Sequence, residues 1–118
     1  MDPLFGLSLG RIAVGAVSLA KPDTAAGLLG LDARANPQAG YVARLFGSRE
    51  IALGALTLIA RGRARRHLVL AGIAVDVADA AAGALGIRDR SISTRAGATM
   101  IGPALGAVVT GVRGLRVS

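Results

Sequence analysis

Charged residues inside otherwise apolar stretches are the residues of this sequence with the greatest potential for chemistry. An ionised side chain surrounded by hydrocarbon costs free energy unless it is paired. Such residues therefore indicate either an internal ion-pair network or a site for a ligand or a proton. The candidate residues for both are Arg11, Arg44, Arg49, Glu50, Asp76 and Asp79. Three arginines and three acids can balance one another, and the sequence does not assign the individual pairs.

Helical spacing places small residues on the same faces as these charges. Asp76 and Asp79 are three positions apart, and a glycine lies four positions before the first and four after the second. Such spacing predicts one shared helix face. Small residues allow helix backbones to approach closely. The glycines expected to pack against neighbouring helices are Gly47, Gly54, Gly72, Gly83, Gly102 and Gly106.

Catalytic, metal and cofactor sites lack the residues they would need. The chain has no cysteine, which excludes disulfides, thiolate chemistry and cysteine-bound metal centres. Its only histidine, His67, follows a run of arginines and has no partner ligands nearby in sequence. No serine has a histidine base close to it, and no glycine-rich stretch matches a phosphate loop. We therefore expect neither an enzyme, nor a metal ion, nor a cofactor.

The basic balance of the chain, a formal net charge of +7, could indicate nucleic acid as a partner. The arginines, however, gather at the ends of apolar stretches or lie singly inside them. Only Phe5, Tyr41 and Phe46 are available to stack on bases. We expect no nucleic-acid partner. The preference for arginine over lysine, together with abundant alanine and glycine, indicates a GC-rich bacterial genome.

The elements that must position the charges are four apolar stretches in one domain, residues 1–118. Each stretch is close to the roughly 20 residues that cross a bilayer core. The chain holds one Glu, one Lys, one Asn and one Gln, too few to solvate the outer faces of soluble helices. The sequence thus predicts an all-α fold, a four-helix transmembrane bundle with a short amphipathic interfacial helix after the first span. The expected spans are about 4–20, 41–60, 67–87 and 96–113, with the interfacial helix at about 23–31.

The loops predict an orientation in the membrane. Four arginines, Arg61, Arg63, Arg65 and Arg66, crowd into the second connection, and the C-terminal end adds two more. The opposite side carries five basic residues diluted by three aspartates. Because positive charge is retained on the cytoplasmic side, we expect a multi-pass protein of the bacterial inner membrane with both termini in the cytoplasm.

Three features together resemble a known group of proteins. They are an arginine in the first helix, the core Gly47-Ser48-Arg49-Glu50-Ile51-Ala52-Leu53-Gly54 in the second, and an aspartate in the third. The group comprises small four-helix bacterial membrane proteins, frequent in actinobacteria, classed as a domain of unknown function and similar in layout to DoxX-like proteins. The resemblance covers about 4–113. It implies a four-helix membrane fold and marks Arg11, Arg49, Glu50 and Asp76, but it implies no reaction.

Three functional hypotheses follow. The leading one is a non-enzymatic accessory or assembly subunit that acts alone, as a homo-oligomer or in a larger membrane complex, surrounded by membrane lipids. The alternative is a membrane-embedded binder or carrier of a small molecule, a lipid or a proton that uses the Arg/Asp/Glu cluster at the membrane midplane. A soluble basic helical bundle is the third, and it predicts expression without detergent.

Overall fold

The computed structural model describes residues 2–117 and contains five helices in that range. No strand occurs among these residues, which confirms the predicted all-helical class. The largest difference from the expected boundaries is at the start of α4, which begins five residues before the expected 67, because the arginines there favour a helix. The helices are α1 (Pro3–Ala20), α2 (Pro22–Leu28), α3 (Ala39–Ile59), α4 (Gly62–Arg88) and α5 (Thr94–Val117).

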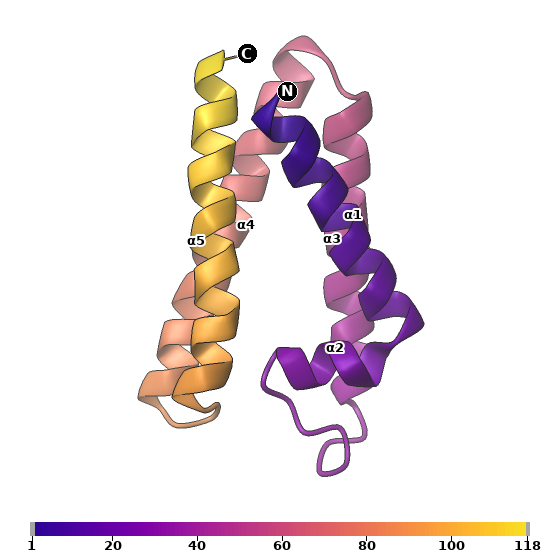
Figure 1. Cartoon of the computed structure of the whole chain (residues 1–118), viewed down its shortest axis with the longest axis vertical. Coiled ribbons are helices and arrows are strands. Elements are labelled where there is room, and N and C mark those ends of the chain that lie inside the picture. The colour runs from indigo at the N-terminus through magenta and orange to yellow at the C-terminus, as the bar shows by residue number, and fades with distance from the viewer. Residues whose placement is uncertain (1, 118) are drawn as a thin grey trace.

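The four long helices form two antiparallel pairs (Figure 1). Helix α1 packs mainly on α3, and α4 packs mainly on α5, whereas the contacts of α1 with α5 and of α3 with α4 are less extensive. The pairs approach each other at the end that holds both termini and the α3–α4 turn. They diverge toward the other end, where α2 and the α4–α5 turn lie. The four long helices are therefore arranged as two pairs that contact each other mainly at one end.

Glycines bring α1 and α3 into backbone contact. A Cβ atom on Gly54 would lie 2.6 Å from the Ser8 carbonyl oxygen, and one on Gly15 would lie 2.5 Å from the Gly47 carbonyl oxygen. Only glycine fits so close an approach without a shift of the backbone. The contact fixes the position of α1 along α3 and sets Arg11 beside Glu50.

The α4–α5 pair uses glycines against isoleucines. Gly97 of α5 packs on Ile87, and Gly111 packs on Ile73, one side chain of α4 at each end of the contact. On the α4 side, Gly83 receives a side chain of α5 in the same way. Small residues on one helix thus provide the holes that the branched side chains of the other fill.

Gly102 and Gly106 of α5 lie on a different face from the one that packs on α4. Both are exposed, and no atom lies within 4 Å of where their Cβ atoms would be. The expected packing role of these two glycines therefore has no counterpart among residues 2–117. Helix α5 carries small residues on two faces. The isoleucines of α4 pack on the face with Gly97 and Gly111, and not on the face with Gly102 and Gly106.

Helix α2 is shorter than the expected 23–31. It ends at Leu28, and Gly30 follows with a φ of 84°. The Leu31 amide donates to the Ala26 carbonyl oxygen at 2.9 Å, the bond that closes a left-handed glycine cap. Ala25 and Ala26 are buried against the start of α3, so α2 has one side packed on the bundle.

Three of the helices are long and apolar enough to cross a membrane: α1, α4, and α5 over Thr94–Arg116. Helix α3 has sufficient length, but any 18 consecutive residues of it include three charges, Arg44, Arg49 and Glu50. Large apolar side chains are exposed on the outer faces, and the molecule is 45 Å long, comparable to a bilayer with its headgroups. These features are consistent with a membrane protein.

Asp2 links the beginning of α1 to α4 through an ion pair. Its carboxylate accepts from the Leu4 amide at 2.9 Å and pairs with Arg65. The hydrogen bond from Arg65, followed by that from the Leu4 amide, lowers the pKa of Asp2 below its ordinary value. A lowered folded-state pKa stabilises the fold above the unfolded pKa of about 3.9, and this contribution is lost as the pH falls below it.

We expect Asp2→Asn to lower the stability by less than about 1 kcal/mol at pH 7, because the ion pair is partly exposed while asparagine still caps the helix. At pH 3 the difference between the variant and the wild type should shrink, since the wild-type carboxylate is then increasingly protonated. Thermal unfolding of both proteins in detergent at the two pH values measures this. An equal difference at pH 7 and pH 3 would contradict the ionic contribution.

Candidate functional site

Arg11 joins three helices through two buried carboxylates. Its Nη1 donates to Glu50 Oε2 at 2.8 Å, and its Nη2 donates to Asp76 Oδ2 at 2.5 Å. A second bond from Nη1 reaches Asp76 Oδ1 at 3.1 Å, so the aspartate is held by both oxygens. All three residues are buried, with 8%, 5% and 4% of their surfaces exposed for Arg11, Glu50 and Asp76 respectively. The contact ties α1 to both α3 and α4.

Arg49 extends the network to the next turn of α4. Its Nη2 lies 2.7 Å from Asp79 Oδ2 and 3.3 Å from Glu50 Oε1, and its Nη1 lies 3.3 Å from Asp79 Oδ1. The guanidinium also lies over the Phe46 ring, 4.9 Å from the centroid. Each arginine therefore touches two acids, and Glu50 is shared by both. The result is a linear chain of alternating charge, Asp76–Arg11–Glu50–Arg49–Asp79.

Arg44 lies outside this chain. It is exposed and forms no ion pair within residues 2–117. It lies five positions before Arg49, so its side chain points about 140° away from that of Arg49 around α3. The expected balance of three arginines against three acids is therefore replaced by two arginines against three acids.

Glycines near the network make room for its side chains. A Cβ on Gly72 would lie 3.1 Å from Arg11 Nη2, so the guanidinium occupies the space that a side chain would take. Gly54 is similarly close to the Arg11 Cβ, at 3.2 Å. Of the other predicted glycines, Gly47 contacts α1 and Gly83 contacts α5. These four glycines lie at helix contacts and are buried.

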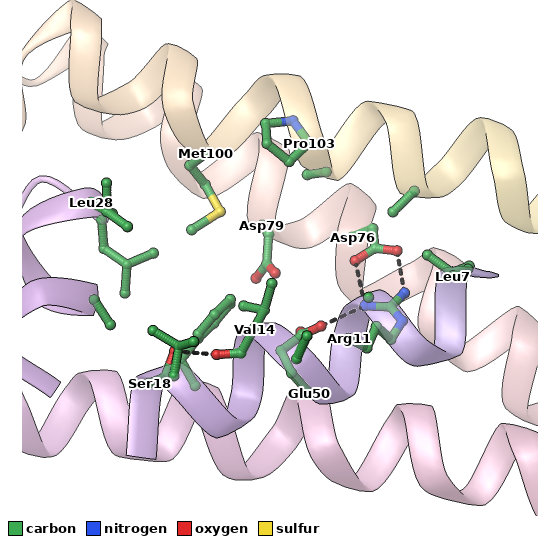
Figure 2. A pocket seen from close by; sticks show the side chains of 18 of the residues that line it. Leu7, Arg11, Val14, Ser18, Leu28, Glu50, Asp76, Asp79, Met100 and Pro103 are labelled. Atoms are coloured by element: carbon green, nitrogen blue, oxygen red, sulfur yellow. Dashed lines mark hydrogen bonds and ion pairs between the residues drawn. The ribbon is translucent and has the colours of Figure 1, made fainter. Parts of the chain in front are cut away.

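A cavity of about 830 Å³ lies between the two helix pairs and borders the network. Figure 2 shows Arg11, Glu50 and Asp76 together at one end, with Leu28 and Met100 toward the other. Gly6 and Gly10 of α1 border it without any atom within 4 Å of their Cβ positions. The lining also includes Leu7, Ala13, Val14, Val17, Ser18, Ala25, Leu29, Phe46, Asp79, Thr99, Pro103, Ala104, Ala107 and Thr110.

The cavity wall was not predicted from the sequence. Leu28, Met100 and Pro103 come from α2 and α5, far from the charged residues along the chain, and nothing in their spacing signals a shared cavity. They line the same cavity because the two helix pairs diverge at this end of the molecule. Of the expected network residues, four border the cavity directly: Arg11, Glu50, Asp76 and Asp79.

This arrangement can hold a molecule that is mostly apolar and has one polar end. The volume is within the range of sites for drug-sized ligands, and such sites combine apolar walls with a few polar groups. No group of three or more histidine, cysteine, aspartate or glutamate residues in the described part of the chain is placed to hold a metal ion. No family model, curated protein or solved structure matches the chain.

Proposed function

We propose that the protein is integral to a bacterial inner membrane and that α1, α3, α4 and α5 all cross it. Three of these helices are apolar enough by themselves, and α3 turns Glu50 and Arg49 toward the other helices while Leu45 and Leu56 stay exposed. Both termini lie at the end of the molecule that carries the basic α3–α4 turn. The excess of arginine there supports a cytoplasmic location for that end. The same layout supports a place among the small four-helix membrane proteins that the sequence resembles.

The function we propose is the binding of an amphipathic small molecule within the membrane. The observation that carries this proposal is the cavity of about 830 Å³, whose apolar walls lead to the ion-pair network halfway along the helices. A lipid-like or drug-like body fits the apolar walls, and its polar end meets the carboxylates. This reverses the order of the two leading hypotheses from the sequence, which could not show a cavity.

A photoreactive long-chain alcohol that carries a diazirine, added to membranes with the expressed protein, tests the proposal. We expect labelling of Met100 to saturate with probe concentration, because that residue borders the cavity, and labelling of the outward Leu105 to rise linearly as for any lipid contact. Gly10→Leu should abolish the saturable labelling, because its side chain enters the open space of the cavity.

Gly102→Leu is the matched control, since Gly102 is equally uncrowded but lies outside the cavity. The same labelling in wild type and in both variants would refute a binding function for the cavity. Membranes washed with high salt and carbonate before detergent extraction provide the preceding test of integration, and release of the protein by the washes would refute the membrane assignment.

An accessory or assembly role is the second candidate. The exposed Gly102 and Gly106 on α5 favour it, because small residues at four-residue spacing permit the close approach of a partner helix. Mild crosslinking in native membranes should then give a defined dimer or heteromeric species that disappears in Gly102→Leu. A strict monomer under these conditions would count against this role.

A further inference from the structure

The ion-pair network begins and ends with a carboxylate. Its order, Asp76–Arg11–Glu50–Arg49–Asp79, contains three acids and two arginines, so the network has a net formal charge of −1 when all five groups are ionised, although each carboxylate contacts an arginine. The sixth candidate, Arg44, does not supply it, because that side chain is exposed on another face of α3. Excess charge that is partly shielded from water is unfavourable, so a site with a net negative charge is complementary to one additional cation.

The two ends of the network differ in their openness. Asp76 has only 5% of its side chain exposed and has both oxygens on Arg11. The Asp79 side chain is 20% exposed, and its partner Arg49 is shared with Glu50. Asp79 borders the cavity whereas Arg49 does not, and Figure 2 shows the Asp79 carboxylate apart from the Arg11 cluster. Asp79 is therefore the carboxylate best placed to receive a group from the cavity.

The neutral polar groups of the cavity wall do not offset this charge. The hydroxyls of Ser18, Thr99 and Thr110 each donate to a carbonyl of their own helix, at 2.8, 2.9 and 2.9 Å. Their hydrogens are thus engaged, and the oxygen lone pairs are what they can present to a ligand. Together with three carboxylates and Arg11, whose two terminal nitrogens already donate to Glu50 and Asp76, they make the polar lining rich in acceptors.

We propose that the ligand of this cavity is a monovalent organic cation, an apolar body that carries one positive charge placed next to Asp79. This inference rests on the proposed binding function and specifies the class of ligand. The apolar wall contacts the apolar part of the ligand. Its positive charge lies next to Asp79 and balances the net negative charge of the network. Anionic amphiphiles of the same size are rejected, since they would place a second negative charge beside the terminal carboxylate.

Tetraphenyl compounds test this inference because their shape is constant while their charge changes. The full chain in lipid nanodiscs is equilibrated by dialysis with tetraphenylphosphonium, neutral tetraphenylsilane or tetraphenylborate, and retention by empty nanodiscs is subtracted. We expect saturable binding of the phosphonium at least about tenfold tighter than that of the silane, as for one charge-assisted contact. The borate should show no saturable binding.

Two variants with opposite expected effects on phosphonium binding test whether Asp79 is the residue that contacts the cation. Asp79→Asn should weaken phosphonium binding by about tenfold or more, whereas Arg49→Gln should strengthen it, because the cavity then gains negative charge. An unfolded protein cannot bind more tightly, so the second variant keeps the test valid even if the first is unstable. Asp89→Asn is the matched control, since it removes an exposed carboxylate in the α4–α5 turn, and it should leave binding unchanged.

The outcomes separate this inference from the proposed function. Equal saturable binding of the phosphonium and the silane, or tighter binding of the borate, would overturn the cation preference while leaving a binding cavity intact. No effect of Asp79→Asn together with weaker binding in Arg49→Gln would also overturn it. Absence of saturable binding by all three compounds would overturn both this inference and the binding function.

Discussion

Replacing Arg11 by methionine should lower the free energy of unfolding by about 3–5 kcal/mol, the cost of leaving buried charges without their partner. Glu50 would keep only Arg49, and Asp76 would keep no arginine at all. Equilibrium unfolding by SDS in mixed micelles, followed by far-ultraviolet circular dichroism, measures the change. Arg44→Met is the matched control, because an exposed arginine outside the network should change stability by about 0.5 kcal/mol or less.

Neutralising the partners should partly restore the stability lost in Arg11→Met. The triple variant Arg11→Met, Glu50→Gln, Asp76→Asn leaves polar groups in the core but no orphaned charge there, so it should be more stable than the single variant. If Arg11→Met costs no more than Arg44→Met, the network does not hold the helices together. Failure of the triple variant to recover any stability would assign the cost to lost packing instead of lost charge.

Gly54→Ala should also destabilise the protein, by about 1–3 kcal/mol, although alanine is the better helix former. The added methyl would lie 2.6 Å from the Ser8 carbonyl oxygen, so α1 must move away from α3. The same SDS titration measures this effect. Gly106→Ala provides the comparison: its methyl meets open space, and we expect unchanged or slightly greater stability.

The expected changes in stability of the two variants differ in sign, even though both replace a glycine by alanine. A loss of stability in Gly106→Ala comparable to that in Gly54→Ala would mean that α5 packs on something through this face. Equal, small gains in both variants would mean instead that α1 and α3 are farther apart than the glycine contacts indicate.

The sequence was sufficient to find most of the charged network because buried charges have few options. Arg11, Glu50 and Asp76 each lie mid-helix among apolar residues. Pairing with one another lowers the free-energy cost of burying their charges. Arg44 lies in the same apolar stretch and therefore fits the same prediction, although its angular position on α3 differs. The individual pairs depended on the register of α1 against α3, which close glycine contacts determine in three dimensions.

The cavity and the packing faces could not be predicted for a related reason. Gly6 and Gly10 have the same spacing as Gly102 and Gly106, yet the first two border the cavity and the last two lie on an outer face. A four-residue spacing indicates that small residues share one face of a helix. It does not indicate whether that face contacts another helix, a cavity or the surroundings of the protein. The divergence of the two helix pairs decides this, and it depends on contacts far apart along the chain.

The division into two helix pairs also bears on how the protein is made. A ribosome delivers α1 and α3 before α4 exists, so Arg11 has Glu50 available 39 residues later but must wait for Asp76, 65 residues away. Among the network residues, the first pair carries two arginines and one acid, and α4 carries two acids. The network residues of the first pair therefore carry one net positive charge and those of α4 two negative charges, an attraction that favours the packing of α4 against the pair already made.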